Sequence, residues 1–313
     1  MKFIFDSDNK SQNLIEIFEN FQLLLKISPQ QINYKILDES NGLIQQTFFI
    51  KSIKKEIKLE LIHKKISENS FLLKIISGPL KNTETKIIIL EKNGKSQIDV
   101  EVKLKTSFSY KIFSSILSKK IQSVNMTLFN RLEKFAKLLY NKKYQISFEK
   151  NYEILTIQLE DKKIFFEGWW LGDIASSFIG ETYQKLPIKN KTVIDIGANI
   201  GDTAISFIHF GAKRIIGLEP FPINYEFFKL NVLKNNLKEQ IEIIQGGCSS
   251  KSSEIFVDPN LSGLSYKMEK KDGGEKINEF SLEELIQKNN IVDGVIKMNC
   301  EGCEYDTILN TSD

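Results

Sequence analysis

Two glycines and two aspartates mark the stretch of the chain that could hold a small charged molecule. Gly197 and Gly201 frame the segment Gly-Ala-Asn-Ile-Gly, with Asp195 shortly before it and Asp202 directly after it. Glycine permits turns that other residues resist, and a helix that begins after such a turn presents unpaired N–H groups. The two aspartates would repel a pyrophosphate, but they suit a ligand that carries an ammonium or sulfonium group.

A third acidic residue, Glu219, stands 22 positions after Gly197 in the segment Gly-Leu-Glu-Pro. In nucleotide-binding α/β folds, an acidic residue at the end of the second strand accepts hydrogen bonds from ribose hydroxyls. The glycine spacing is G-x-x-x-G, whereas dinucleotide enzymes use G-x-G-x-x-G. Together these features predict an S-adenosylmethionine pocket and disfavour the alternative of a dinucleotide enzyme.

A second group of candidate residues lies in the segment Lys-Met-Asn-Cys-Glu-Gly-Cys-Glu, residues 297–304. We expect Glu301 to orient or deprotonate an acceptor hydroxyl, because a carboxylate can serve as a general base. The alternative is that Glu301 and Glu304 only cap the following helix or shape the floor of the cofactor site. Asn299 offers an amide oxygen without charge or basicity.

Cys300 and Cys303 form a C-x-x-C pair that invites a metal or redox interpretation. A zinc site needs four ligands, whereas the chain holds one further cysteine, two histidines (His63 and His209) and no second C-x-x-C pair. We therefore predict neither zinc binding nor a redox function. The small, odd number of cysteines also excludes a disulfide scaffold and fits a reducing cytoplasm.

The elements that must position these groups are those of a parallel α/β sheet. Apolar runs typical of buried parallel strands cover 191–197, 214–219, 241–245 and 293–299. A helix is expected after the glycine turn, ending at Gly211. Strands are expected at 152–159 and 163–166, followed by Trp169 and Trp170, which either pack in the core or cover a ligand.

The motifs of this half of the chain resemble the FkbM-type methyltransferase family. In chain order they are Val-Ile-Asp-Ile-Gly-Ala-Asn-Ile-Gly-Asp-Thr (193–203), Gly-Leu-Glu-Pro-Phe-Pro (217–222), Asn231 with Asn235-Asn236, and Lys-Met-Asn-Cys-Glu-Gly-Cys-Glu-Tyr (297–305). The resemblance runs from about residue 165 to the chain end. It implies a Rossmann-like fold, S-adenosylmethionine as cofactor, and methyl transfer to hydroxyls of sugars or natural products.

The resemblance also assigns individual residues by their position in these motifs. The methionine part of the cofactor would lie against Asp195, Gly197, Asn199 and Gly201, the ribose against Glu219, and the adenine against Gly247 and Cys248, with Ala198, Asp202 and Pro220 completing the set. The catalytic candidates are Asn299, Glu301 and Glu304, and no metal site is expected. The family's pattern is K-x-D-x-E-G-x-E, and Asn299 occupies its Asp position, which puts a role as an anionic base or a metal ligand in doubt there.

Residues 1–141 show a different pattern. Strands are expected near 2–5, 31–38, 43–50, 55–66, 71–77, 84–91 and 96–106, with helices over 11–27 and 110–140. This order resembles the START/polyketide-cyclase-like (helix-grip) superfamily, in which an antiparallel sheet wraps a C-terminal helix. The resemblance implies either an apolar pocket for a lipid-like ligand or a filled core used for docking. His63, alone in its strand, is expected at the surface.

We therefore expect two domains: an α+β helix-grip domain over 1–141, and a C-terminally short Rossmann-like α/β methyltransferase domain over 142–313. The expected activity is S-adenosylmethionine-dependent methylation of a hydroxyl on a sugar or other glycan, a lipid-linked molecule or a natural product. The alternative is a non-catalytic sensor that binds S-adenosylmethionine or a lipid. The last parallel strand would leave an uncovered edge where a second copy could pair, unless the sequence is a fragment of a longer chain.

Charge and hydropathy exclude several other classes of protein. The net charge is +3 and lysine greatly outnumbers arginine, so nucleic-acid recognition through arginine forks is not expected. No apolar stretch approaches the ~20 residues of a membrane-spanning helix, and the N-terminus lacks the apolar region of a secretory signal. We accordingly expect a cytoplasmic protein.

Overall fold

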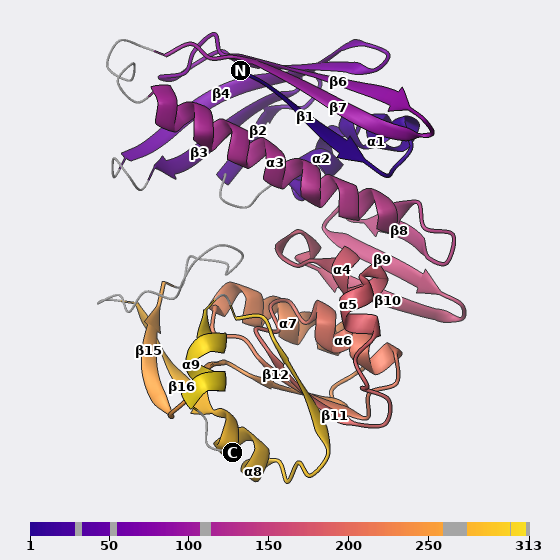
Figure 1. Cartoon of the computed structure of the whole chain (residues 1–313), viewed down its shortest axis with the longest axis vertical. Coiled ribbons are helices and arrows are strands. Elements are labelled where there is room, and N and C mark those ends of the chain that lie inside the picture. Colours follow the sequence, from indigo (N-terminus) through magenta and orange to yellow (C-terminus); the bar gives the residue numbers. More distant parts are fainter. Residues whose placement is uncertain (29–32, 51–54, 107–113, 259–273, 301, 311–313) are drawn as a thin grey trace. The chain divides into compact units, whose positions relative to one another are not determined.

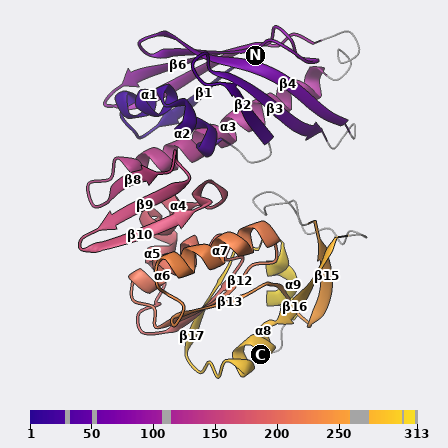
Figure 2. The ribbon, with the colours of Figure 1, turned by 180° about the vertical axis from the view of Figure 1, so that it is seen from behind.

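The computed structural model describes residues 1–28, 33–50, 55–106, 114–258, 274–300 and 302–310. The chain divides into two compact units, Met1–Asn141 and Lys142–Asp313. Figures 1 and 2 show the chain from two opposite sides. Among the described residues, no helix combines the length and apolar character needed to cross a bilayer.

The first unit is built on a seven-stranded antiparallel sheet (Figure 1). Its strands are β1 (Lys2–Ser7), β2 (Asn33–Asp38), β3 (Leu43–Ile50), β4 (Lys55–Ser67), β5 (Ser70–Ile75), β6 (Glu84–Lys92) and β7 (Lys95–Lys103). The strand order is β1-β7-β6-β5-β4-β3-β2, so the first strand pairs with the last. All the predicted strands of this half are confirmed, with bounds that differ by a few residues, and the predicted positions 31–32 lie outside the described residues.

Helices α1 (Ser11–Glu19), α2 (Phe21–Ile27) and α3 (Ser114–Leu139) accompany this sheet. The prediction of a single helix over 11–27 is wrong, because the helix is interrupted at Asn20. The Asn20 side chain accepts a hydrogen bond from the Leu23 backbone N–H at 3.0 Å and so begins α2. Asparagine favours such a capping position over a helix interior. The long helix is confirmed as α3, and the predicted positions 110–113 lie outside the described residues.

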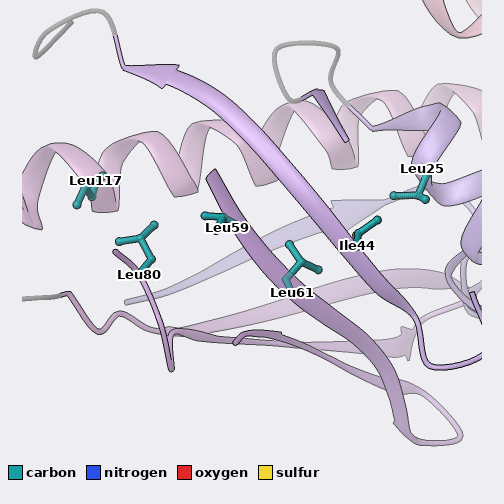
Figure 3. Packing of buried hydrophobic residues seen from close by; sticks show 6 residues of the cluster. All are labelled: Leu25, Ile44, Leu59, Leu61, Leu80 and Leu117. Carbon is teal, nitrogen blue, oxygen red and sulfur yellow. The ribbon is translucent and has the colours of Figure 1, made fainter. Parts of the chain in front are cut away.

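A leucine-rich cluster joins α2 and α3 to the sheet (Figure 3). Its buried members are Leu25, Ile44, Leu59, Leu61, Leu80 and Leu117. Leu59 and Leu61 point to the same face because side chains in a strand alternate with a period of two. The alternating pattern seen in the sequence therefore marks the face of the sheet that packs against the helices.

His63 belongs to this inner face, so the expected surface position is wrong. It follows Leu59 and Leu61 at the same strand period, and its ring lies between two phenylalanines. The ring centroids are 5.9 Å from Phe21 and 5.7 Å from Phe71, with nearly parallel planes in both pairs. Burial lowers the pKa of His63 to about 4, so the ring is neutral at physiological pH.

The second unit begins with a three-stranded sheet in the order β10-β9-β8. The strands are β8 (Gln145–Glu149), β9 (Ile154–Leu159) and β10 (Lys162–Glu167), and η3 (Trp169–Leu171), α4 (Ile174–Ile179) and α5 (Glu181–Gln184) follow. β8 was not predicted from the sequence. Trp169 is buried and its indole N–H donates to the Tyr152 carbonyl at 2.8 Å, which confirms core packing for this tryptophan.

Four parallel strands form the main sheet of this unit, in the order β13-β12-β11-β17. They are β11 (Thr192–Ile196), β12 (Arg214–Leu218), β13 (Ile241–Ile244) and β17 (Gly294–Met298), connected through α6 (Asp202–His209), α7 (Pro222–Lys234) and α8 (Leu282–Lys288). All four predicted strands are confirmed. The strand order reverses at β11, and ligands of open α/β sheets bind at such a switch point, beyond the carboxyl ends of the strands.

Each face of the parallel sheet packs against its own helices. Ile194, Ile216 and Leu218 contact α8 through Leu285, whereas Gly217 faces Phe228 of α7. A small mixed sheet, in the order β14-β16-β15, was not predicted. It consists of β14 (Gly246–Ser249), β15 (Ser253–Val257) and β16 (Glu275–Ser281), and α9 (Cys303–Asn310) follows β17. Among the described strands β17 pairs only with β11, and Ile296 is 40% exposed at this edge.

Candidate functional site

The glycine turn lies where the sequence places it, between the end of β11 and the start of α6. The N–H groups of Gly197 and Ala198 both donate to the Leu218 carbonyl, at 3.0 and 2.9 Å. This carbonyl ends β12, so the turn is held against the neighbouring strand. The backbone is left-handed at Gly197, Asn199 and Gly201, with φ values of 73°, 53° and 83°.

The two glycines of the turn serve close packing within the protein. A Cβ atom at Gly197 would lie 2.2 Å from the Asn299 carbonyl oxygen, and one at Gly201 would lie 2.2 Å from the Phe228 ring. The two glycines therefore admit the end of β17 and a phenylalanine of α7. That they also line the methionine part of the cofactor stays a prediction.

Gly201→Ala is expected to destabilise the second unit by about 2–4 kcal/mol, because left-handed strain and a steric clash add together. Gly211→Ala is the matched control. Gly211 also has a positive φ of 100°, but the nearest atom to its Cβ position lies at 3.6 Å. Urea unfolding followed by tryptophan fluorescence measures both, since both tryptophans lie in this unit. Equal losses would show that the Phe228 contact is not decisive.

Glu219 joins the ends of β11 and β12 through hydrogen bonds to backbone groups. Its Oε2 accepts from the Asn199 N–H at 2.8 Å, and its Oε1 accepts from the Phe221 N–H at 3.0 Å. The side chain is almost fully buried. Burial raises its pKa to about 7, although these two hydrogen bonds act in the opposite direction. The carboxylate still has lone pairs for further donors, because each oxygen can accept more than one hydrogen bond.

Two amide oxygens near Glu219 have no hydrogen-bond partner among the described residues. They are Oδ1 of Asn199 and Oδ1 of Asn224, and both are buried. The Asn199 Nδ2 donates to the Leu171 carbonyl at 2.8 Å. This hydrogen bond fixes the orientation of the amide group and leaves its Oδ1 without a partner among the described residues. Buried polar atoms without partners are rare in native proteins, and a bound ligand is one explanation for them.

Asp195 forms a buried ion pair with Lys297. The Lys297 Nζ lies 2.7 Å from the Asp195 Oδ1 and donates to the Gly197 carbonyl at 3.0 Å, while the Thr203 hydroxyl donates to the Asp195 Oδ2. Burial alone would lower the pKa of Lys297, but the adjacent Asp195 charge outweighs it and the pKa is raised. The expectation of a free negative charge at Asp195 is therefore wrong.

Asp202 opens α6 and is also engaged by the protein. The Ser177 hydroxyl of α4 donates to its Oδ2 at 2.7 Å. Burial raises the pKa of Asp202 to about 6, and the Ser177 hydrogen bond opposes this shift. Asp202 is therefore a second carboxyl beside the turn that titrates close to neutral pH.

These raised pKa values predict that the stability of the second unit falls as the pH rises. Glu219 and Asp202 hold their protons in the folded state up to about pH 7 and 6, whereas the unfolded chain releases them near the ordinary values of 4.5 and 3.8. The resulting stabilisation is present below about pH 4 and is lost as the pH rises through 6 to 7. We expect the free energy of unfolding to decrease by a few kcal/mol over this range.

Glu219→Gln, which cannot titrate, tests the source of this dependence. It should flatten the pH profile of unfolding, measured by tryptophan fluorescence in urea. Glu226→Gln is the control, because Glu226 is exposed on α7 and pairs at the surface with Lys229. A slope unchanged in Glu219→Gln would contradict the assignment.

The candidate catalytic residues of the segment 297–304 differ in their surroundings. The Asn299 side chain is exposed, and its backbone N–H donates to the Ile196 carbonyl at 3.0 Å. The Glu304 carboxylate accepts the N–H groups of Cys300 and Gly302, both at 2.8 Å. This is the capping role given as the alternative for Glu304. Glu301 lies outside the described residues.

The two residues predicted to border the adenine, Gly247 and Cys248, lie on β14. Cys248 points into the apolar core, and burial raises the pKa of its thiol to about 11. Only its backbone can therefore border a ligand. Gly247 precedes it on the same strand, and Pro220 and Ala198 are buried beside Glu219 and the turn.

Lys297, Ser177 and Asn224 contribute to the site but were missed as site residues. A signal for Lys297 was available, because a lysine inside the apolar run Val-Ile-Lys-Met needs a buried partner. Ser177 and Asn224 carried no comparable signal, since each meets its partner only through the packing of α4 and α7.

Comparison with known proteins finds a family match within the second unit. Residues 195–312 match the family described as the methyltransferase FkbM domain. The chain is 33% identical over 60 residues to the ribosomal protein L11 methyltransferase of Tolumonas auensis (strain DSM 9187 / NBRC 110442 / TA 4), which is 19% of this chain. The matched segment covers 20% of the length of that relative.

Three solved structures that are similar to part of the chain each cover less than half of it. One is a protein from Thermus thermophilus (TM-score 0.38, 8% identity, 45% of this chain and 99% of that chain). Another is the di-domain ARO/CYC StfQ from the steffimycin biosynthetic pathway (TM-score 0.37, 6% identity, 44% and 50%). A third is a START superfamily protein from Mycobacterium smegmatis (TM-score 0.35, 14% identity, 43% and 97%).

Proposed function

We propose that the second unit is an S-adenosylmethionine-dependent methyltransferase that acts on a hydroxyl of a sugar, lipid-linked or natural-product acceptor. The family match over residues 195–312 supports methyl transfer. The observation that carries the cofactor proposal is the buried Glu219 at the switch point, flanked by the unpartnered oxygens of Asn199 and Asn224.

The donor and acceptor chemistry of these residues fits the proposed cofactor. Ribose hydroxyls and an ammonium group are hydrogen-bond donors, and the turn offers unsatisfied acceptors to both. Glu219 would accept the ribose hydroxyls, and the Asn199 amide oxygen would accept from the ammonium group of the methionine part. The backbone of Gly247 would border the adenine.

The chain's own contribution is positioning and exclusion of water. S-adenosylmethionine, when bound, supplies an electrophilic methyl group on a sulfonium. The Asp195–Lys297 pair holds the glycine turn against the end of β17, and Glu219 holds the same turn against the end of β12. A fixed turn aligns donor and acceptor, and alignment of this kind accounts for several kcal/mol of a reaction barrier.

Glu301→Gln is expected to lower the rate of methyl transfer by about 10²- to 10⁴-fold, the usual contribution of a general base. The proposal favours Glu301 because the carboxylate of Glu304 already accepts two backbone N–H groups and Asn299 carries no charge. Transfer of a labelled methyl group to a hydroxyl acceptor measures the rate. Glu304→Gln is the comparison variant, expected to act mainly through the stability of the chain around α9. A near wild-type rate in Glu301→Gln would eliminate the base role.

Isothermal titration calorimetry with three ligands tests the cofactor itself. We expect binding of S-adenosylmethionine and of its demethylated product, S-adenosylhomocysteine, and none of NAD. Binding of NAD without binding of the methyl donor would overturn the proposal and favour a dinucleotide enzyme.

A sensor that binds the cofactor without turnover is the second candidate function. It is favoured by Asn299, which removes the carboxylate of the family pattern at the end of β17. Tight binding of S-adenosylmethionine without methylation of any member of a hydroxyl library would support it.

For the first unit we propose that it presents a hydrophobic or lipid-linked acceptor. The proposal rests on the antiparallel sheet and its apolar face toward α3. Native mass spectrometry of the full chain, after incubation with a lipid library, tests it. Mass increments from bound lipid are expected, and a chain that stays free of lipid across the library would remove this role.

A further inference from the structure

Cys300 and Cys303 form a disulfide, which was not predicted from the sequence. Their Cα atoms lie 5.6 Å apart. The bond joins the residues that follow β17 to the first residue of α9. Both cysteines are partly buried against the apolar cluster that contains Ile196, Leu218 and Cys248. The buried thiol of Cys248 is free.

On one side the disulfide adjoins the glycine turn. A Cβ at Gly197 would lie 2.2 Å from the Asn299 carbonyl oxygen and 3.2 Å from the Cys300 Cα atom. The Asn299 N–H donates to the Ile196 carbonyl at 3.0 Å. The backbone at Cys300 is therefore in direct contact with the turn that follows β11.

On the other side of the disulfide, Cys303 is the first residue of α9, and this helix contacts β14. Glu304 accepts the Cys300 and Gly302 N–H groups, and Asp306 accepts the Ser250 N–H at 2.8 Å. Thr307 is fully buried, with its hydroxyl 4.0 Å from the Cys248 sulfur. The position of α9 is thus linked to the strand that we assign to the adenine border.

We propose that the Cys300–Cys303 disulfide is a reducible clasp that holds the end of β17 and the start of α9 in the conformation that binds S-adenosylmethionine. This inference rests on the proposed function of the second unit. Reduction by a dithiol, whether dithiothreitol or a dithiol protein, would release the clasp and weaken cofactor binding.

Reduction of the Cys300–Cys303 disulfide needs no co-reactant other than the dithiol. One thiolate of the dithiol attacks a sulfur of the disulfide and forms a mixed disulfide, and its second thiolate then displaces the remaining cysteine. Cys300 and Cys303 gain two electrons and two protons, and the dithiol becomes a disulfide. Cytosolic disulfides, where they occur, are usually of this reversible kind.

Reduction is expected to raise the Kd for S-adenosylhomocysteine by about threefold to tenfold, because a preorganised backbone binds with less loss of conformational freedom. The experiment titrates the full chain with S-adenosylhomocysteine before and after treatment with dithiothreitol. Alkylation under denaturing conditions, followed by mass spectrometry, should count one free thiol before reduction and three after it. The double variant Cys300→Ser/Cys303→Ser should resemble the reduced protein and show no response to dithiothreitol.

Hydrogen–deuterium exchange of the wild-type chain provides a readout that does not depend on binding. Amides around 294–310 should exchange faster after reduction, whereas amides of β1 to β7 should not change. Equal Kd values in the two redox states, or three free thiols in the untreated protein, would overturn the inference. Binding in neither state would instead overturn the proposed cofactor, and unchanged exchange around 294–310 would overturn the clasp.

Discussion

Glu219→Ala is expected to weaken S-adenosylmethionine binding by about a hundredfold to ten-thousandfold. Two charge-assisted hydrogen bonds to the ribose would be lost, each worth ~1.5–3 kcal/mol. The same substitution leaves the Asn199 and Phe221 N–H groups without their acceptor, so the turn itself would loosen. Both effects act in the same direction, which makes this one of the largest losses expected from a single substitution.

Glu226→Ala is the matched control for Glu219→Ala. Glu226 is exposed on α7, seven residues further along the chain, and its contact is a surface ion pair with Lys229 at 2.7 Å. Exposed pairs of this kind contribute little. Glu219→Gln separates binding from folding, because it keeps an acceptor oxygen and is expected to retain part of the affinity. Calorimetry measures all three variants, and equal affinities for Glu219→Ala and Glu226→Ala would show that the ribose site has been misassigned.

Lys297→Met is expected to destabilise the second unit by about 3–5 kcal/mol, because it leaves the fully buried Asp195 without a counter-charge. The Gly197 carbonyl would lose its donor at the same time. The double variant Asp195→Asn/Lys297→Met removes the buried charge as well. It should recover a large part of the lost stability, since replacing both partners of a buried pair is much milder than replacing one.

Lys191→Met provides the comparison for Lys297→Met. Lys191 pairs with Asp293 at a similar distance, 2.8 Å, but the Asp293 side chain is 73% exposed. A loss of less than ~1 kcal/mol is expected for such a surface pair. Urea unfolding followed by tryptophan fluorescence measures both variants. If Lys297→Met proves as mild as Lys191→Met, the contribution of the buried Asp195–Lys297 pair has been misjudged.

The regular elements could be predicted because their local patterns agree with the final fold. The strands of the first unit and the four parallel strands of the second show the period or apolar run that their burial requires. The helix after the glycine turn ends at His209, two residues before the expected Gly211. β8 and the mixed sheet were not predicted. Two further errors occurred where a single polar residue competes with the pattern. Asn20 divides one predicted helix into two by accepting the Leu23 N–H, and His63 lies on the inner face of β4 between two phenylalanine rings.

By itself the sequence determined which residues meet at the switch point. Asp195 lies near the end of β11, Gly197 and Asn199 follow this strand, and Glu219 follows β12. The carboxyl ends of adjacent parallel strands lie side by side. Spacing along the chain was sufficient for this because β11 and β12 are joined by one helix.

Only the tertiary structure decided what each of these residues contacts. Asp195 meets Lys297 because β17 pairs with β11 in parallel register, although the two residues are far apart in sequence. Gly197 and Gly201 are needed because a Cβ atom there would clash with the Asn299 carbonyl oxygen and the Phe228 ring, respectively. The two cysteines form a disulfide between the end of β17 and the start of α9. Charge pairing, close packing and cross-linking depend on distances in space, and local periodicity carries no information about those distances.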